Sequence, residues 1–93
     1  QSASWTLKEQ VKFDEKGITS KDWETYPIMT FGEVPEIETI LIDRKDSPVL
    51  GAGEATQGPT AAAISNAVFD AVGIRLRRIP FTPEMVLEAA VKA

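Results

Sequence analysis

Apolar residues recur at helical spacing in three parts of the chain. The most regular stripe runs from Pro59 to Val72, where apolar side chains follow the i, i+3, i+4, i+7 spacing of a buried helix face. Pro59 suits the first position of this helix, and Gly73 ends it. Thr82-Pro83-Glu84 begins another helix, and residues 1–13 carry an imperfect amphipathic stripe. The pattern therefore predicts three helices.

Two shorter segments have the pattern of strands. Residues 37–42 are rich in β-branched side chains and apolar on both faces, which predicts a strand covered on two sides. Residues 74–79 alternate apolar and basic side chains, as a short strand does. Gly17 is expected to close the first helix in a left-handed conformation. We therefore predict an α+β fold of three helices with short strands, in a single segment spanning residues 1–93.

Composition excludes several kinds of chemistry. The 93 residues include no cysteine and no histidine, so disulfides, thiol catalysis, iron–sulfur ligation and histidine-based triads are excluded within this chain. The formal net charge of −4 comes without a basic stripe, which argues against a nucleic-acid partner. No apolar run approaches the ~20 residues that span a bilayer. Any chemistry must come from carboxylates, hydroxyls, amines, or a cofactor held mainly by other protein.

Only the glycine-rich stretch 51–60 has the character of a site. Residues 53–60 match the phosphate-binding loop G-x-x-x-x-G-K-[ST] except that Pro59 replaces the lysine, which removes both a charge and an N–H and excludes a triphosphate site. Two interpretations remain. Spacing alone favours a structural turn that leads into a helix. The alternative is a working carboxylate, Glu54, on a loop whose glycines let the backbone approach a cofactor.

A family resemblance changes this balance. It rests on the loop Gly51-Ala52-Gly53-Glu54, on the helix residues Asn66-Ala67-Val68-Phe69-Asp70-Ala71-Val72-Gly73, and on Arg75-Leu76-Arg77-Arg78-Ile79-Pro80. Together they resemble the C-terminal part of the molybdopterin-binding large subunit in the xanthine dehydrogenase and aldehyde oxidase family. Two upstream stretches resemble its isoquinoline 1-oxidoreductase branch: Ser4-Trp5-Thr6-Leu7-Lys8-Glu9-Gln10 and Trp23-Glu24-Thr25-Tyr26-Pro27-Ile28.

The resemblance implies roles for the loop residues. Glu54 would be the general base at a molybdenum centre that oxidises an aldehyde or N-heterocycle with oxygen derived from water. Gly51 and Gly53 would let the loop approach the cofactor. Thr56 and Gln57 would contact the cofactor or substrate, or else cap the following helix. The family's cofactor would be molybdopterin, in its cytosine dinucleotide form, with iron–sulfur clusters in a partner subunit.

The resemblance also implies that this chain does not act alone. Residue 1 follows no capping residue and no initiating methionine, so we expect a piece of a longer polypeptide, incomplete as a molybdopterin-binding domain. We expect the isolated chain to be inactive and to hold no cofactor; its partners would be the rest of the large subunit and a separate iron–sulfur subunit. The compartment stays open between the cytoplasm and periplasm of a bacterium. The alternative is an autonomous, non-catalytic α+β interaction domain.

Overall fold

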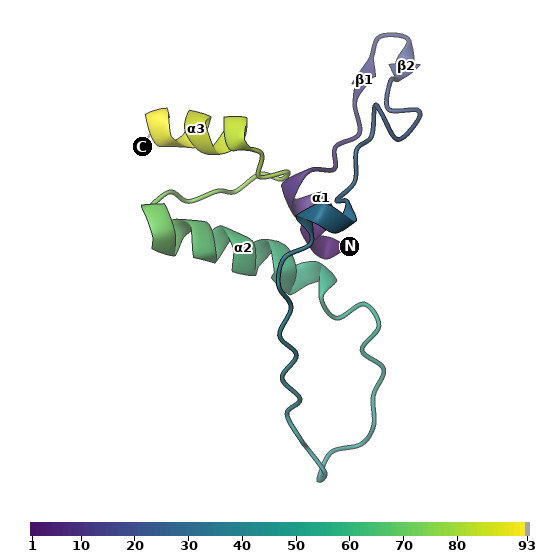
Figure 1. Cartoon of the computed structure of the whole chain (residues 1–93), viewed down its shortest axis with the longest axis vertical. Helices are drawn as coiled ribbons and strands as arrows, with labels where there is room; N and C mark the ends of the chain where they lie inside the picture. The colour runs from purple at the N-terminus through teal and green to yellow at the C-terminus, as the bar shows by residue number, and fades with distance from the viewer. Residues whose placement is uncertain (93) are drawn as a thin grey trace.

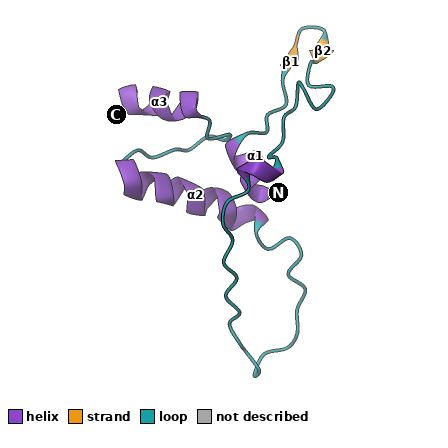
Figure 2. Ribbon diagram, in the orientation of Figure 1, coloured by secondary structure: helices purple, strands orange, loops and turns teal. Residues whose placement is uncertain are grey.

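The computed structural model describes residues 1–92, which form an open arrangement of helices with two long excursions (Figures 1 and 2). Its elements are α1 (Ser2–Leu7), β1 (Phe13–Asp14), β2 (Gly17–Ile18), the 3-10 turn η1 (Phe31–Glu33), α2 (Gln57–Val72) and α3 (Pro83–Lys92). Helix α1 packs on α2, and the N-terminus lies at this contact. No helix among residues 1–92 is both long and apolar enough to cross a bilayer.

Helix α2 confirms the strongest prediction and moves its start. It begins at Gln57, two positions before Pro59, so proline occupies the third helical position rather than the first. The first four N–H groups of a helix have no intrahelical acceptor, so proline at this position removes no hydrogen bond. Gly73 ends the helix with φ 73°, and its N–H donates to the Phe69 carbonyl at 2.8 Å. This is the left-handed cap that the sequence predicts.

Helix α1 is shorter than the expected helix over residues 1–13. It ends at Leu7, and the Thr6 hydroxyl donates to the Ser2 carbonyl at 2.7 Å. Beyond it the chain forms a hairpin in which Phe13 lies opposite Ile18. Gly17 has φ 126° there, so its positive φ serves the hairpin turn and the predicted helix cap is wrong.

The two predicted strands do not form among residues 1–92. Residues 37–42 are extended but exposed, and no strand lies beside them. Residues 74–79 cross the surface of α2, where the buried Ser65 hydroxyl donates to the Leu76 carbonyl at 2.7 Å. A strand needs a neighbour to accept and donate its backbone hydrogen bonds, and the described chain supplies none to either segment.

A small core lies where α1, α2 and the segment after α2 meet. Leu76 and Phe81 are its buried large apolar side chains, and the Phe81 N–H donates to the Thr6 carbonyl at 2.7 Å. Thr6 is fully buried. Helix α3 lies beside residues 75–78, with its Met85, Val86 and Ala89 half-buried. The Met85 N–H donates to the Thr82 hydroxyl at 3.3 Å, as the predicted capping threonine requires.

The chain is far less compact than a self-sufficient domain of its size. Its radius of gyration is 16.8 Å, whereas a compact chain of this length has about 12 Å. Its accessible surface is 8147 Å², against roughly 5300 Å² for a compact monomer of the same mass. Many large apolar side chains are exposed, including all those in residues 37–50. Most of the apolar surface therefore has no partner within the described chain.

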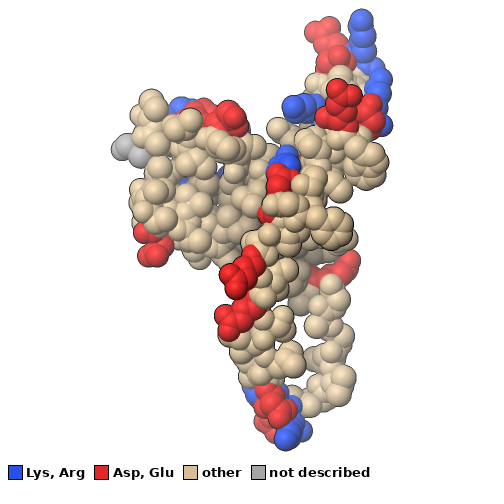
Figure 3. All heavy atoms as spheres, viewed as in Figure 1, with Lys and Arg blue, Asp and Glu red and all other residues tan. Residues whose placement is uncertain are grey.

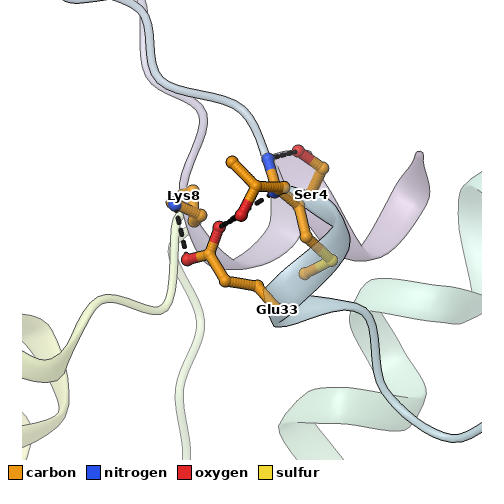
Figure 4. A network of polar contacts seen from close by, with 5 residues as sticks. Ser4, Lys8 and Glu33 are labelled. Carbon is orange, nitrogen blue, oxygen red and sulfur yellow. Dashed lines mark hydrogen bonds and ion pairs between the residues drawn. The ribbon is translucent and has the colours of Figure 1, made fainter.

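A polar network fixes the 3-10 turn η1 to α1 (Figure 4). The Lys8 ammonium donates to Glu33 Oε1 at 2.6 Å, while the Thr30 N–H and hydroxyl both donate to Glu33 Oε2 at 2.9 Å. The Met29 N–H donates to the Ser4 hydroxyl at 2.9 Å. The Lys8 hydrogen bond, followed by the donors of Thr30, lowers the pKa of Glu33 from its ordinary value of 4.5 to about 2.

The contact between η1 and α1 should weaken at low pH, because it depends on the charged carboxylate of Glu33. Because the pKa of Glu33 is lower in the folded chain, its charged form contributes stability above pH 4.5 that is lost as the pH falls towards about 2. Salt should weaken the ion pair between Lys8 and Glu33, because the Glu33 carboxylate is exposed to solvent. We expect the Thr30 amide resonance to titrate with a midpoint near 2, measured by NMR as the pH falls from 6 to well below 2. Glu33→Gln should abolish this transition and the exposed Glu36→Gln should leave it; a midpoint at 4.5 would contradict the assignment.

Candidate functional site

The predicted site residues lie on the loop that enters α2. An extended arm from residue 35 reaches a turn at residues 44–47, and a second arm returns through residues 48–56 to the helix (Figure 1). Residues 51–56 are exposed along their whole length. The structure thus brings Gly51, Gly53, Glu54 and Thr56 together at the N-terminal end of α2, with Gln57 as its first residue.

Glu54 lies in a turn immediately before the helix. Its carbonyl accepts the Gln57 N–H at 3.2 Å, and its Oε1 accepts a hydrogen bond from Gln57 Nε2 at 3.3 Å. That amide is the one hydrogen-bond partner of its carboxylate among residues 1–92. The aligned peptide dipoles of the 16-residue helix favour negative charge at this end. The carboxylate therefore lies in a defined turn, and most of its hydrogen-bonding capacity is unused among residues 1–92.

Thr56 and Gln57 make hydrogen bonds only with residues close to them in the sequence, among those that the structure describes. Thr56 occupies the capping position of α2, but its side chain makes no capping hydrogen bond; its carbonyl instead accepts the Thr60 hydroxyl at 2.7 Å. Gln57 orients the Glu54 carboxylate through its side-chain amide. Of the two roles predicted from sequence, side-chain capping by Thr56 is wrong. The Gln57 contact is one that sequence spacing could not identify.

Neither the backbone conformation nor the packing of residues 1–92 requires glycine at positions 51 and 53. Neither has a left-handed φ, and a Cβ built on either would meet no heavy atom within 4 Å. The usual reasons for glycine, an unusual backbone conformation or close packing, are therefore absent from the described residues. The space beside Gly51 and Gly53 is open, so a ligand or another polypeptide can approach the backbone closely there.

The loop by itself is not an enclosed binding site. Residues 1–92 hold no group of three or more histidine, cysteine, aspartate or glutamate side chains that could bind a metal ion. A groove of about 560 Å³ lies elsewhere, between α1 and the segment before η1. Trp5, Trp23 and Tyr26 line this groove, whereas Phe31 is 98% exposed. The groove thus gathers three large aromatic side chains away from Glu54.

The arginines that follow α2 are partly engaged in structure. The Arg75 guanidinium donates to Asn66 Oδ1 at 2.6 Å and lies 4.2 Å from the centre of the Phe69 ring. Both partners belong to α2, so this arginine fixes the outgoing chain on the helix. The surface view shows no broad basic area on the face it presents, which agrees with the composition (Figure 3).

The chain is similar to short segments of much longer proteins that are named as dehydrogenases or oxidoreductases. It is 51% identical to a nicotinate dehydrogenase subunit from Pseudomonas putida over 89 residues, which are 96% of this chain and 8% of that protein. It is 33% identical to the aldehyde oxidoreductase molybdenum-binding subunit PaoC of Escherichia coli over 89 residues, 88% of this chain and 12% of that protein. No family profile matches the chain.

A third relative has a name that gives a different cofactor. The chain is 34% identical over 91 residues to the membrane-bound aldehyde dehydrogenase [pyrroloquinoline-quinone] of Gluconacetobacter polyoxogenes, which covers 92% of this chain and 12% of that protein. The sequence relationship is of the same kind as with PaoC, although the two names differ in cofactor. The chain spans between 8% and 12% of the length of these relatives.

Proposed function

Because this chain belongs, as a short segment, to the molybdenum-binding subunits of the xanthine dehydrogenase and aldehyde oxidoreductase family, we propose that it forms one wall of a molybdenum site with Glu54 as general base. The observation that carries the proposal is the Glu54 carboxylate, exposed on a glycine-flanked turn at the positive end of α2. Among the described residues, Gln57 is its one hydrogen-bond partner. In the proposed complete protein this surface faces the cofactor.

The residues present fit one side of such a cofactor. Gly51 and Gly53 leave open space where any Cβ would project, so a large planar group can approach the backbone. When bound, the cofactor would supply the two-electron redox chemistry and the water-derived oxygen that ends on the substrate. Glu54 would accept the proton that this oxygen loses, while Gln57 Nε2 holds the carboxylate in position. Gly51, Gly53, Thr56 and Gln57 would border the cofactor.

The remaining walls must come from other protein. A buried ligand site encloses most of its ligand, whereas the loop at residues 51–56 is exposed throughout. We therefore propose that the isolated chain is inactive and that the cofactor is molybdopterin in its cytosine dinucleotide form. We also propose that electrons leave to iron–sulfur clusters in a partner subunit, as the family resemblance implies.

The names of the relatives support a proposal for the substrate class. We propose an aldehyde or an N-heterocycle, as for the isoquinoline 1-oxidoreductase branch. The relative at 51% identity is named for nicotinate, and this supports the N-heterocycle. The relatives named for aldehydes are 33% and 34% identical. An aldehyde substrate therefore has weaker support from the sequence.

The proposal can be tested on the native protein. Purified from its source and analysed by intact mass and by elemental analysis, the polypeptide that contains this sequence should be many times longer than 93 residues and should carry molybdenum in near-stoichiometric amount. A bound quinone without molybdenum would overturn the proposed cofactor. A free 93-residue protein without either group would instead support the non-catalytic interaction domain, whose binding surface would be the groove of Trp5, Trp23 and Tyr26.

A further inference from the structure

Residues 36–42 form an extended arm with a strand-like sequence and no strand partner. The arm begins after Pro35 and ends before a turn that is closed by the Ser47 N–H donating to the Arg44 carbonyl at 3.1 Å. Seven residues span about 23 Å when extended, an ordinary length for a strand. Beyond Glu38 the arm carries no charge until the turn, where charged side chains gather (Figure 3).

The backbone of this arm is unpaired within the described chain. Among residues 1–92, no N–H or carbonyl of residues 36–42 takes part in a backbone hydrogen bond, either with the returning arm or with a helix. Apolar side chains beside such a backbone shield it from water once they are covered, and a covered backbone group without a partner is strongly destabilising. Whatever covers these side chains must therefore also supply backbone donors and acceptors, as the edge of a β-strand does.

Both faces of the arm are apolar. Ile37 and Leu41 project to one face and are 74% and 87% exposed; Ile40 and Ile42 project to the other and are 78% and 82% exposed. A strand at the surface of a sheet has one apolar and one polar face, whereas apolar residues on both faces are typical of a strand covered on both sides. The acidic residues of the arm lie at its beginning, nearest the helices.

The turn after the arm indicates which end reaches solvent. Arg44 Nε lies 3.3 Å from Asp46 Oδ1, and Lys45 Nζ lies 3.2 Å from Asp43 Oδ2, so the charges at the tip pair locally and all four side chains are exposed. Such a self-paired polar turn needs no partner. The charged tip can therefore stay in solvent, whereas the apolar arm before it lacks a covering surface among residues 1–92.

We propose that residues 36–42 are an internal strand of a β-sheet whose neighbouring strands come from other parts of a longer polypeptide. The relatives give the reason for assigning the neighbouring strands to a longer polypeptide and not to a second copy of the chain. The match to the nicotinate dehydrogenase subunit covers 96% of this chain and continues through the arm, in a protein of which the chain is 8%. The inference rests on the proposed function only in requiring that longer polypeptide.

Hydrogen–deuterium exchange of the native protein tests the inference. Amides of residues 37–42 should exchange on the order of 100-fold more slowly in the complete protein than in the isolated 93-residue chain, at every protein concentration. Exchange as fast as in the isolated chain would overturn the strand. Protection that disappears on dilution would show that a second copy of the protein supplies the neighbouring strands. That result would overturn their assignment to the same polypeptide.

A pair of proline variants gives an independent readout. Ile40→Pro removes an N–H from the middle of the proposed strand and should abolish protection of its neighbours or prevent assembly. Lys45→Pro falls at the second position of the turn, where proline is favoured, and should leave protection unchanged. Equal tolerance of both would contradict the proposal. Molybdenum measured on the same samples separates the hypotheses: protection without molybdenum overturns only the proposed function, and molybdenum with fast exchange only the strand.

Discussion

Replacing Glu54 with glutamine in the complete protein should lower turnover by roughly 10²–10⁴-fold, the range that a positioned general base contributes. The amide keeps the size of the side chain but cannot accept the proton. In the part of the chain that the structure describes, the carboxylate has one hydrogen-bond partner, the Gln57 side chain, and its position is exposed. The exchange should therefore leave folding and molybdenum content near those of the wild type. Steady-state kinetics, elemental analysis and thermal unfolding of the same preparation measure the three quantities.

Glu15→Gln is the matched control for charge. Glu15 lies in the exposed hairpin turn between β1 and β2, so the variant changes net charge by the same amount without touching the loop before α2. Its turnover should match that of the wild type. If Glu54→Gln retains activity within about tenfold of the wild type, far less than a general base contributes, then Glu54 is not the base. Loss of molybdenum with loss of activity would instead assign Glu54 to holding the cofactor.

Phe81→Ala should have the largest effect on stability. Phe81 is one of two buried large apolar side chains among the described residues, at 8% exposure, and its N–H bonds to Thr6 in α1. Truncating a buried phenylalanine removes about 3–5 kcal/mol from the free energy of unfolding. A core as small as this one supplies no more than about that amount. We therefore expect the isolated chain to lose its cooperative unfolding transition, measured by far-ultraviolet circular dichroism in urea.

Phe31→Ala makes the same chemical change where the side chain is 98% exposed. It should shift the free energy of unfolding by less than about 0.5 kcal/mol, as surface substitutions do. Similar losses in the two variants would mean that the packing of Phe81 between α1 and α2 is not what stabilises the chain.

Local sequence signals determined the parts of this protein whose hydrogen bonds close within a few residues. Helix α2 satisfies its own backbone, so the apolar spacing and the left-handed Gly73 were sufficient to predict it and its end. The capping Thr82 likewise marked the start of α3. Pro59 was enough to exclude a triphosphate-binding loop, since that conclusion depends on a missing charge and a missing N–H and not on where the loop lies.

Only the tertiary structure decided where the chain needs partners. The β-branched run at 37–42 has the same sequence whether or not a strand lies beside it, and the structure shows that none of residues 1–92 does. The stripe over residues 1–13 likewise did not reveal that α1 ends at Leu7, because the end depends on contacts with residues 25 positions away, such as Met29 and Glu33. Glu54 combines both cases. The sequence was enough to identify its carboxylate and its glycine-flanked turn, whereas the open space beside them could be seen only in the tertiary structure.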